Sequence, residues 1–219
     1  GLNVHLLDCW IHPSNIYQML SRAVRIRPDL IVVSASRFDV DVADDLVVEL
    51  KRQKDAPLVI GIGQGHYYNR ADRNIDDREY DAILLGEPEQ EFFRLFEWIR
   101  ESGAFHKDWK DYYRNCYAEG KSFVVEEADK LPFSSYTREE LGSYKSIFPV
   151  QLPERAVWGY LIATRGCPHG CEYCSVIHNF GRADQLDRQQ LVRLCQSIAR
   201  VCQAEVTDLL PSQKPSPET

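Results

Sequence analysis

"PDLIVVSASRFDVDVADDLVVELKRQKDAPLVIGIGQG", residues 28–65, is the stretch that decides the fold. Its first part, 28–36, is a short apolar run rich in β-branched residues, with a proline before it and serines after it, which is typical of a strand buried on both faces. Residues 41–53 have the apolar periodicity of a helix, and 56–65 contain a second short apolar run. A strand, a helix and a strand in close succession predict two parallel strands joined by a helical crossover.

The same alternation continues on both sides of this stretch. Upstream, residues 3–9 resemble a strand and 13–27 a helix; downstream, residues 80–86 resemble a strand and 88–102 a helix. Such regular alternation with short connections favours an α/β fold, an open parallel sheet with helices on both faces.

Small and polar residues follow the predicted strands. In an open parallel sheet ligands bind outside the carboxyl ends of the strands. The candidate binding residues at these ends are Ser34, Ser36, Gly61, Gly63, Gly65, His66, Gly86 and Glu87. Glycines after strands commonly serve only as turn residues, and G-x-G-x-G is not the dinucleotide fingerprint G-x-G-x-x-G. A lone histidine is more often structural than a ligand, and a glutamate there can simply favour a helix N-terminus.

Between residues 103 and 151 the alternation stops. Residues 112–127 resemble a hairpin that turns at Glu119 and Gly120, and the following segment carries proline, serine and scattered aromatics without periodicity. We expect an interdomain connector here.

Composition narrows the functional classes. The chain has 219 residues and a net charge of −7 without a basic stripe, so no nucleic-acid partner is expected. No apolar run reaches the length of about 20 residues that spans a bilayer, and no signal segment opens the chain. Seven cysteines, an odd number and clustered, argue for thiolate ligands in a reducing compartment. We expect a cytoplasmic protein.

The cysteine cluster lies in "TRGCPHGCEYCS", residues 164–175, after a predicted strand over 156–166 and before a predicted helix over 187–203. Cys167, Cys171 and Cys174 have the spacing C-x3-C-x2-C. Structural zinc takes four ligands, usually as two separated pairs, and the ferredoxin spacings also differ. Three thiolates would hold three irons of a four-iron cluster and leave the fourth iron open. Cys195 and Cys202 share one helix face and are expected in a core.

The segment "RGCPHGCEYC", including Tyr173, resembles the signature of radical S-adenosylmethionine (SAM) enzymes. The order of parts extends the likeness: an α/β region ending in "LLGEPEQEFF" (84–93), then "DKLPF" (129–133), then the cysteines. This order resembles the radical SAM family with a cobalamin-binding domain, which includes an anaerobic oxidative cyclase and carbon and phosphorus methyltransferases.

The resemblance implies a flavodoxin-like sheet of the cobalamin-binding type, followed by a partial (β/α) barrel. Cys167, Cys171 and Cys174 would ligate a [4Fe-4S] cluster whose open iron binds SAM, with Tyr173 beside the adenine. Cobalamin would rest on the strand ends named above. The family's chemistry is methyl transfer or a radical rearrangement or cyclisation of a small molecule, with electrons from a flavodoxin- or ferredoxin-type donor. The resemblance identifies no further catalytic residue and no particular substrate.

Some features depart from the family pattern. We expect a cobalamin-binding-like domain over 1–102 that lacks its first strand, a connector over 103–151, and only the beginning of a radical SAM domain over 152–219. A chain truncated in this way is expected to be inactive alone. Two alternatives stay open: a methylthiotransferase, although its second cluster needs three N-terminal cysteines and only Cys9 and Cys116 are present, and a non-catalytic iron–sulfur or cobalamin module.

Overall fold

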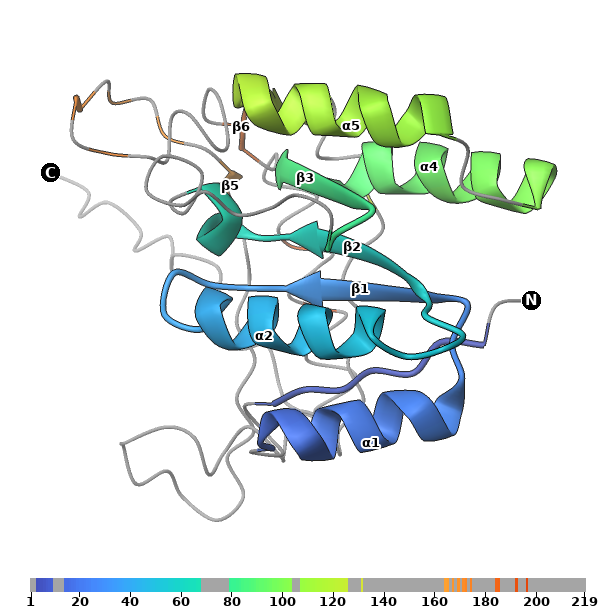
Figure 1. Ribbon diagram of the computed structural model, residues 1–219. Coiled ribbons are helices and arrows are strands. Elements are labelled where there is room, and N and C mark those ends of the chain that lie inside the picture. The colour runs from blue at the N-terminus through green and yellow to red at the C-terminus, as the bar shows by residue number, and fades with distance from the viewer. Residues whose placement is uncertain are drawn as a thin grey trace, which may run out of the picture. The chain divides into compact units, whose positions relative to one another are not determined.

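The computed structural model divides the chain into two compact units. One unit comprises Ser14–Glu126 and Arg165–Asp184, and the other comprises Gly1–Pro13, Glu127–Thr164 and Gln185–Thr219. The described residues are 3–9, 14–67, 79–103, 107–125, 131, 164–165, 167, 169, 171–172, 174, 184–185, 192 and 196. The first unit holds the sheet on which the site is built (Figure 1).

A parallel sheet of four strands forms the centre of this unit. The strands are β1 (Leu30–Ser34), β2 (Leu58–Ile62), β3 (Ala82–Gly86) and β4 (Ser122–Phe123), and they lie in the order β1-β2-β3-β4. All three neighbouring pairs are parallel. The α/β fold with an open parallel sheet, consistent with a flavodoxin-like sheet, is therefore confirmed.

In the described part of this unit, four helices longer than a single turn accompany the strands. They are α1 (Ile16–Ile26), α2 (Val40–Lys51), α4 (Glu89–Ser102) and α5 (Lys107–Glu119). α1 begins where a capping box predicts a start: the Asn15 side chain accepts from the backbone N–H of Gln18, and the Gln18 side chain accepts from that of Asn15. The first three helices confirm the helices expected over 13–27, 41–53 and 88–102.

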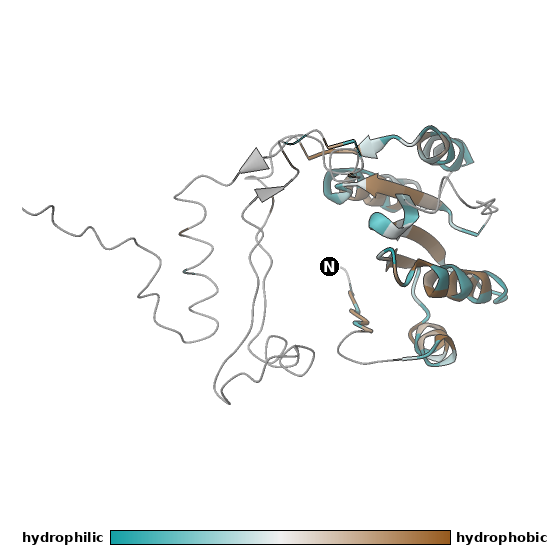
Figure 2. Cartoon of the chain, turned by 90° about the vertical axis from the view of Figure 1, so that its left-hand side faces the viewer, coloured by the Kyte–Doolittle hydropathy of each residue, from teal (hydrophilic) through white to brown (hydrophobic). Residues whose placement is uncertain are grey.

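The core lies on both faces of the sheet, because alternate residues of a strand point to opposite faces. One face carries Val59, Ile83 and Leu85 and packs against Val47 of α2. The other carries Ile60, Ala82 and Leu84 and packs against Leu95 of α4. Figure 2 shows the apolar strands between the more polar outer surfaces of the helices.

A buried ion cluster lies where the chain enters β3. Asp81 is only 5% exposed; its carboxylate forms ion pairs with Lys51 of α2 and Lys110 of α5 and accepts from the Val59 N–H at 2.8 Å. Burial acts to raise the pKa of Asp81, but the hydrogen bonds from Lys110, Lys51 and Val59 together hold it below its usual value. The carboxylate thus connects α2, α5 and the start of two strands.

The hairpin expected over 112–127 is wrong. Residues up to Glu119 belong to α5, and Gly120, with φ of +71°, ends the helix. The N–H of Gly120 donates to the Tyr117 carbonyl at 3.0 Å and that of Lys121 to the Cys116 carbonyl at 2.8 Å, which is a Schellman motif. The chain then enters β4 and pairs with β3, so residues expected in a connector extend the sheet.

Two further expectations about strands are corrected. Residues 3–9 contain no strand, and Val4 and Leu6 are 79% and 81% exposed, since the segment has no strand partner to hold it extended. β1 is paired on one side only and Val32 is 40% exposed, so β1 is an edge strand in the described sheet and is not buried on both faces.

The second half of the chain is described in parts. β5 (Thr164–Arg165) pairs with β6 (Asp184–Gln185). Most of the strand expected over 156–166 and of the helix expected over 187–203 lies outside the described residues, and so do Cys195 and Cys202. The expected barrel stays a prediction. None of the helices in the described ranges has both the length and the apolar character of a membrane span.

Candidate functional site

The carboxyl ends of the first three strands meet at one edge of the sheet. Ser34 is paired with Ile62, and Ile62 with Leu84, so the chain leaves the three strands from one row. The eight predicted binding residues lie in this row, next to it or after it, and define what we call the strand-end rim: Ser34, Ser36, Gly61, Gly63, Gly65, His66, Gly86 and Glu87.

Two glycines of the rim are required by close contacts within the protein. Gly63 has φ of +99°, and a Cβ there would lie less than 3.0 Å from the Ala35 carbonyl oxygen. A Cβ on Gly65 would meet the Ser36 carbonyl oxygen in the same way. The N–H of Gly65 donates to the Ala35 carbonyl at 3.0 Å. The space that these glycines leave is therefore filled by the loop between β1 and α2.

That loop is itself ordered by its serine. The Ser36 N–H donates to the Asp39 carboxylate, and the Ser36 hydroxyl accepts from the Phe38 N–H at 3.2 Å. Ser34 is exposed at the end of β1, while Ser36 is half-buried. Both residues present surface at the rim, and Asp39 makes the start of α2 acidic.

The buried part of the rim is centred on His66, in a helical turn after β2. His66 is fully buried, and burial lowers its pKa to about 4. Gly61 is buried within β2 and leaves room for this ring, since a Cβ there would lie 3.0 Å from His66 Nε2. His66 is thus a core residue under the rim rather than a side chain on its surface.

The third strand end is clamped to β4. Gly86 has φ of +86°, and the N–H of Glu87 donates to the Phe123 carbonyl at 2.8 Å. The buried Glu87 carboxylate accepts from the Val125 N–H at 2.9 Å. Glu87 therefore holds the sheet together here, whereas Gly86 keeps part of its surface exposed.

The structure thus divides the eight candidates into two groups. Four keep exposed or half-exposed surface: Ser34, Ser36, Gly63 and Gly86. Four are buried beneath them: Gly61, Gly65, His66 and Glu87. Sequence reasoning missed the buried polar residues that accompany His66, namely Tyr80, whose hydroxyl donates to Asp44 at 3.0 Å, and Tyr117. No local pattern marks them, since their contacts span long sequence separations.

The cysteine loop offers three free thiols. Cys167, Cys171 and Cys174 are each half-buried, and none is in a disulfide. The N–H of Cys174 donates to the Cys171 carbonyl at 3.0 Å, which forms a turn between the last two. Tyr173 lies outside the described residues. Within the described ranges, no three His, Cys, Asp or Glu side chains are gathered around one point as metal ligands would be.

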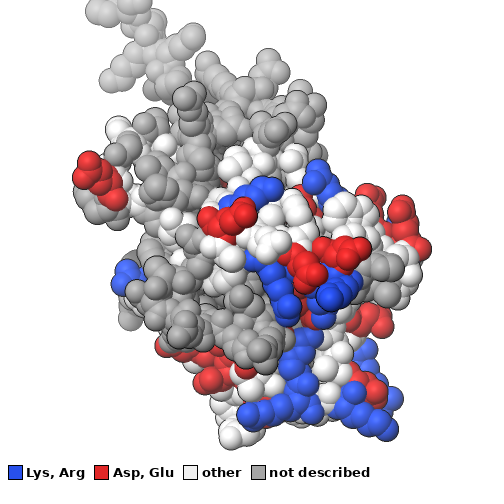
Figure 3. Space-filling view, turned by 45° about the horizontal axis from the view of Figure 1, so that its top comes forward, with Lys and Arg blue, Asp and Glu red and all other residues white. Residues whose placement is uncertain are grey.

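Charge is distributed without a dominant sign. Figure 3 shows Lys and Arg beside Asp and Glu over the described surface of one face, with several basic side chains adjoining one another toward its lower edge. Exposed pairs such as Arg52 with Glu49 on α2 contribute to such mixing of charge.

Comparison with known proteins adds no relative: no family model, no curated protein and no solved structure matches the chain.

Proposed function

We propose that this chain belongs to a radical SAM enzyme that uses a [4Fe-4S] cluster, SAM and cobalamin for methyl transfer or another radical conversion of a small molecule. One observation carries the proposal: Cys167, Cys171 and Cys174 have the C-x3-C-x2-C spacing and are free, half-buried thiols in the unit that also holds the parallel sheet.

The donor chemistry of the loop fits an iron–sulfur cluster. Thiolates are soft ligands that select such clusters, and these three thiols are not engaged in disulfides. The cluster, when bound, supplies the electron that cleaves the sulfonium of SAM. The three cysteines hold it, and by the family resemblance Tyr173 lies beside the adenine.

The fit to cobalamin rests on fewer residues than expected. Ser34, Ser36, Gly63 and Gly86 retain surface at the strand-end rim and would form the platform. The buried residues Gly61, Gly65, His66 and Glu87 would support that platform from below. The protein would orient and shield the cofactors, whose reactivity is their own.

Anaerobic reconstitution with iron and sulfide tests the cluster. We expect about four irons per chain, a change in the electron paramagnetic resonance spectrum when SAM is added to the reduced protein, and loss of both in Cys171→Ala. The matched control is Cys9→Ala, which should bind iron as the parent does. Stoichiometric zinc held tetrahedrally after the same treatment would contradict the proposal. A cluster whose electron paramagnetic resonance spectrum does not change when SAM is added would favour a non-catalytic module.

Titration with hydroxocobalamin tests the rim. Gly63→Leu would distort the backbone, so the better probe is Ser34→Trp, which places a large ring on the exposed end of β1. We expect it to abolish the spectral change and the retention of cobalamin on a desalting column. Ser21→Trp, on the exposed side of α1, should leave both unchanged. If the parent protein retains no cobalamin, the cobalamin part of the proposal is wrong, and a radical SAM enzyme that does not use cobalamin remains.

A further inference from the structure

The imidazole of His66 is buried without a partner. The residue is 0% exposed, and neither ring nitrogen has a hydrogen-bond partner among the described residues. The Val33 backbone lies close enough to favour a charged ring, but it does not reach hydrogen-bond geometry with either nitrogen. Buried polar atoms are nearly always paired, so this ring is a weak point in the packing.

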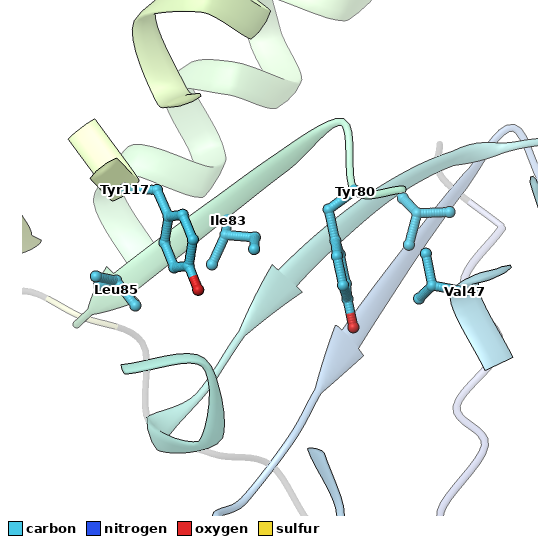
Figure 4. Packing of buried hydrophobic residues seen from close by; sticks show 6 residues of the cluster. Val47, Tyr80, Ile83, Leu85 and Tyr117 are labelled. Atoms are coloured by element: carbon cyan, nitrogen blue, oxygen red, sulfur yellow. The ribbon is translucent and has the colours of Figure 1, made fainter. Parts of the chain in front are cut away.

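The ring is tightly enclosed. Its edge meets the Tyr80 ring at a centroid distance of 5.1 Å and an interplanar angle of 78°. Gly61 lies against Nε2 and has no side chain that could donate or accept. Figure 4 shows Tyr80 on the same face of the sheet as Ile83, Leu85 and Tyr117, with Val47 of α2 nearby. A protonated ring in this apolar cluster would have no anion within hydrogen-bond reach.

The charged groups around this pocket come from α2, from the residue before it and from Glu79, which acts on Tyr80 through space. Asp39 acts on His66 through space, and Asp44 accepts from Tyr80 at 3.0 Å. α5 contributes Tyr117, whose hydroxyl donates to the His66 carbonyl at 3.2 Å. β1, β2 and the turn itself contribute no charged side chain. The nearest destination for a protonated imidazole is therefore the acidic start of α2.

Contacts with neighbouring segments hold the turn that carries His66 in place. The N–H of Gly65 donates to the Ala35 carbonyl at 3.0 Å, and the Tyr67 side chain packs against the core cluster that contains Tyr80. With the bond from Tyr117, these connect residues 63–67 to the loop after β1 and to α5. Releasing the turn breaks these contacts without unpairing the β1–β2 ladder.

We propose that residues 63–67 form an acid-opened latch on the strand-end rim, in which protonated His66 leaves the core, moves toward Asp39 and lifts the turn from the ends of β1 and β2. The opened latch exposes Gly61, Tyr80 and the underside of the rim. Neutral His66 returns to the core when the proton is lost.

The direction of the pH effect follows from linkage. Burial lowers the pKa of closed His66 to about 4, whereas an imidazole released into water has its ordinary pKa of 6.5. The open state binds the proton more tightly, so acidification from pH 6.5 toward pH 4 favours opening. Between pH 7 and pH 5 the closed-to-open ratio should fall about 20-fold.

Hydrogen exchange at pH 7 and pH 5, corrected for intrinsic rates, tests the latch. We expect protection of residues 63–67 to fall about 20-fold while the amides of α1 and α4 keep theirs. His66→Gln and His66→Phe should remove this pH dependence, and His5→Gln, at an exposed site, should retain it. Equal loss across the whole unit, or pH dependence that persists without His66, would overturn the latch.

A measurement on the parent chain covers the case in which the variants fail to fold. The imidazole resonance of His66 should titrate with a pKa well below 6.5, and Tyr80 resonances should shift in the same pH window. A His66 resonance that titrates with an ordinary value while residues 63–67 remain protected would also overturn the proposal.

Discussion

Gly63 and Gly103 both adopt positive φ, +99° and +68°, but only Gly63 lies against another backbone. At Gly103 a Cβ would meet nothing within 4 Å, whereas at Gly63 it would collide with Ala35. The pair therefore separates the cost of a left-handed conformation from the cost of a steric collision.

We predict that Gly103→Ala lowers the free energy of unfolding by about 1 kcal/mol, and that Gly63→Ala lowers it by about 3 kcal/mol because a backbone shift is added. Urea denaturation followed by tryptophan fluorescence measures both. Equal losses in the two variants would mean that the segment after β2 can move away from Ala35, after β1, at little cost in free energy.

Asp81 allows a second prediction at this scale. Removing its charge leaves Lys51 and Lys110 without their shared carboxylate, so Asp81→Asn should destabilise the unit by about 3 kcal/mol at pH 7. The pKa of folded Asp81 is held below 3.8, so its contribution is present above that pH and is lost as the pH falls further. The variant should thus show a flatter stability profile below pH 4 than the parent.

The control for Asp81→Asn is Asp55→Asn, at an exposed position in the loop before β2. This control should change neither the stability at pH 7 nor the loss of stability below pH 4. If both variants lost stability below pH 4 as the parent does, a group other than Asp81 would have to account for that loss.

At the scale of elements, α5 shows why a hairpin was wrongly predicted over 112–127. Trp109, Tyr113, Cys116 and Tyr117 have helical spacing, but Glu119-Gly120 followed by β-branched residues resembles a hairpin. The same glycine serves as a helix C-cap residue with φ of +71°. Both structures use a glycine at positive φ, so the choice depends on whether β3 is available to pair with β4.

Tyr113 and its neighbour Tyr112 give a matched pair on α5. Tyr113 is fully buried and donates to Glu91 at 2.9 Å, whereas Tyr112 is 39% exposed and bonds to Lys121 at 3.1 Å. Tyr113→Phe leaves the buried Glu91 short of a donor and should cost about 1.5 kcal/mol. Tyr112→Phe should cost less than about 0.5 kcal/mol. Thermal unfolding of both variants compares them, and the reverse order would contradict the assigned role of the buried bond.

The elements that were predicted correctly share a physical property. The first three helices and β1 to β3 each carry their own apolar pattern and clear end signals, such as Asn15 before α1 and Gly103 after α4. Residues 3–9 carry an apolar pattern as well, but a strand exists only when a partner pairs with it. Pairing depends on the neighbouring strands of the sheet, so the sequence of one segment alone cannot predict it.

For the whole molecule, the candidate site could be predicted only in outline. The order of strands placed eight residues at one edge, yet the sequence could not show that half of them are buried. Burial depends on contacts such as those of Gly61 with Tyr80 and His66, which join separate parts of the chain. The role of the three cysteines stays a prediction, carried by their spacing.

The position of β1 at the edge of the described sheet leads to a prediction about association. Exposed apolar edge strands pair with other chains, and natural proteins often protect such edges with lysine. Val32→Lys should therefore slow the growth of light scattering at high protein concentration without lowering the melting temperature. Val42→Lys, on α2 and similarly exposed at 45% against 40% for Val32, should have a smaller effect. Equal effects would indicate that added charge alone, rather than the strand edge, is responsible.

In the four-stranded sheet, the order β1-β2-β3-β4 means that β2, β3 and β4 each pair with the strand that precedes them along the chain. As the polypeptide leaves the ribosome, each new strand can add to an edge that is already complete, and no later strand has to insert between two earlier ones. Domains generally fold as units from the N-terminus during synthesis. The sheet can therefore grow in step with translation. When β4 pairs with β3, it brings α5 and its tyrosines against strands that have already paired.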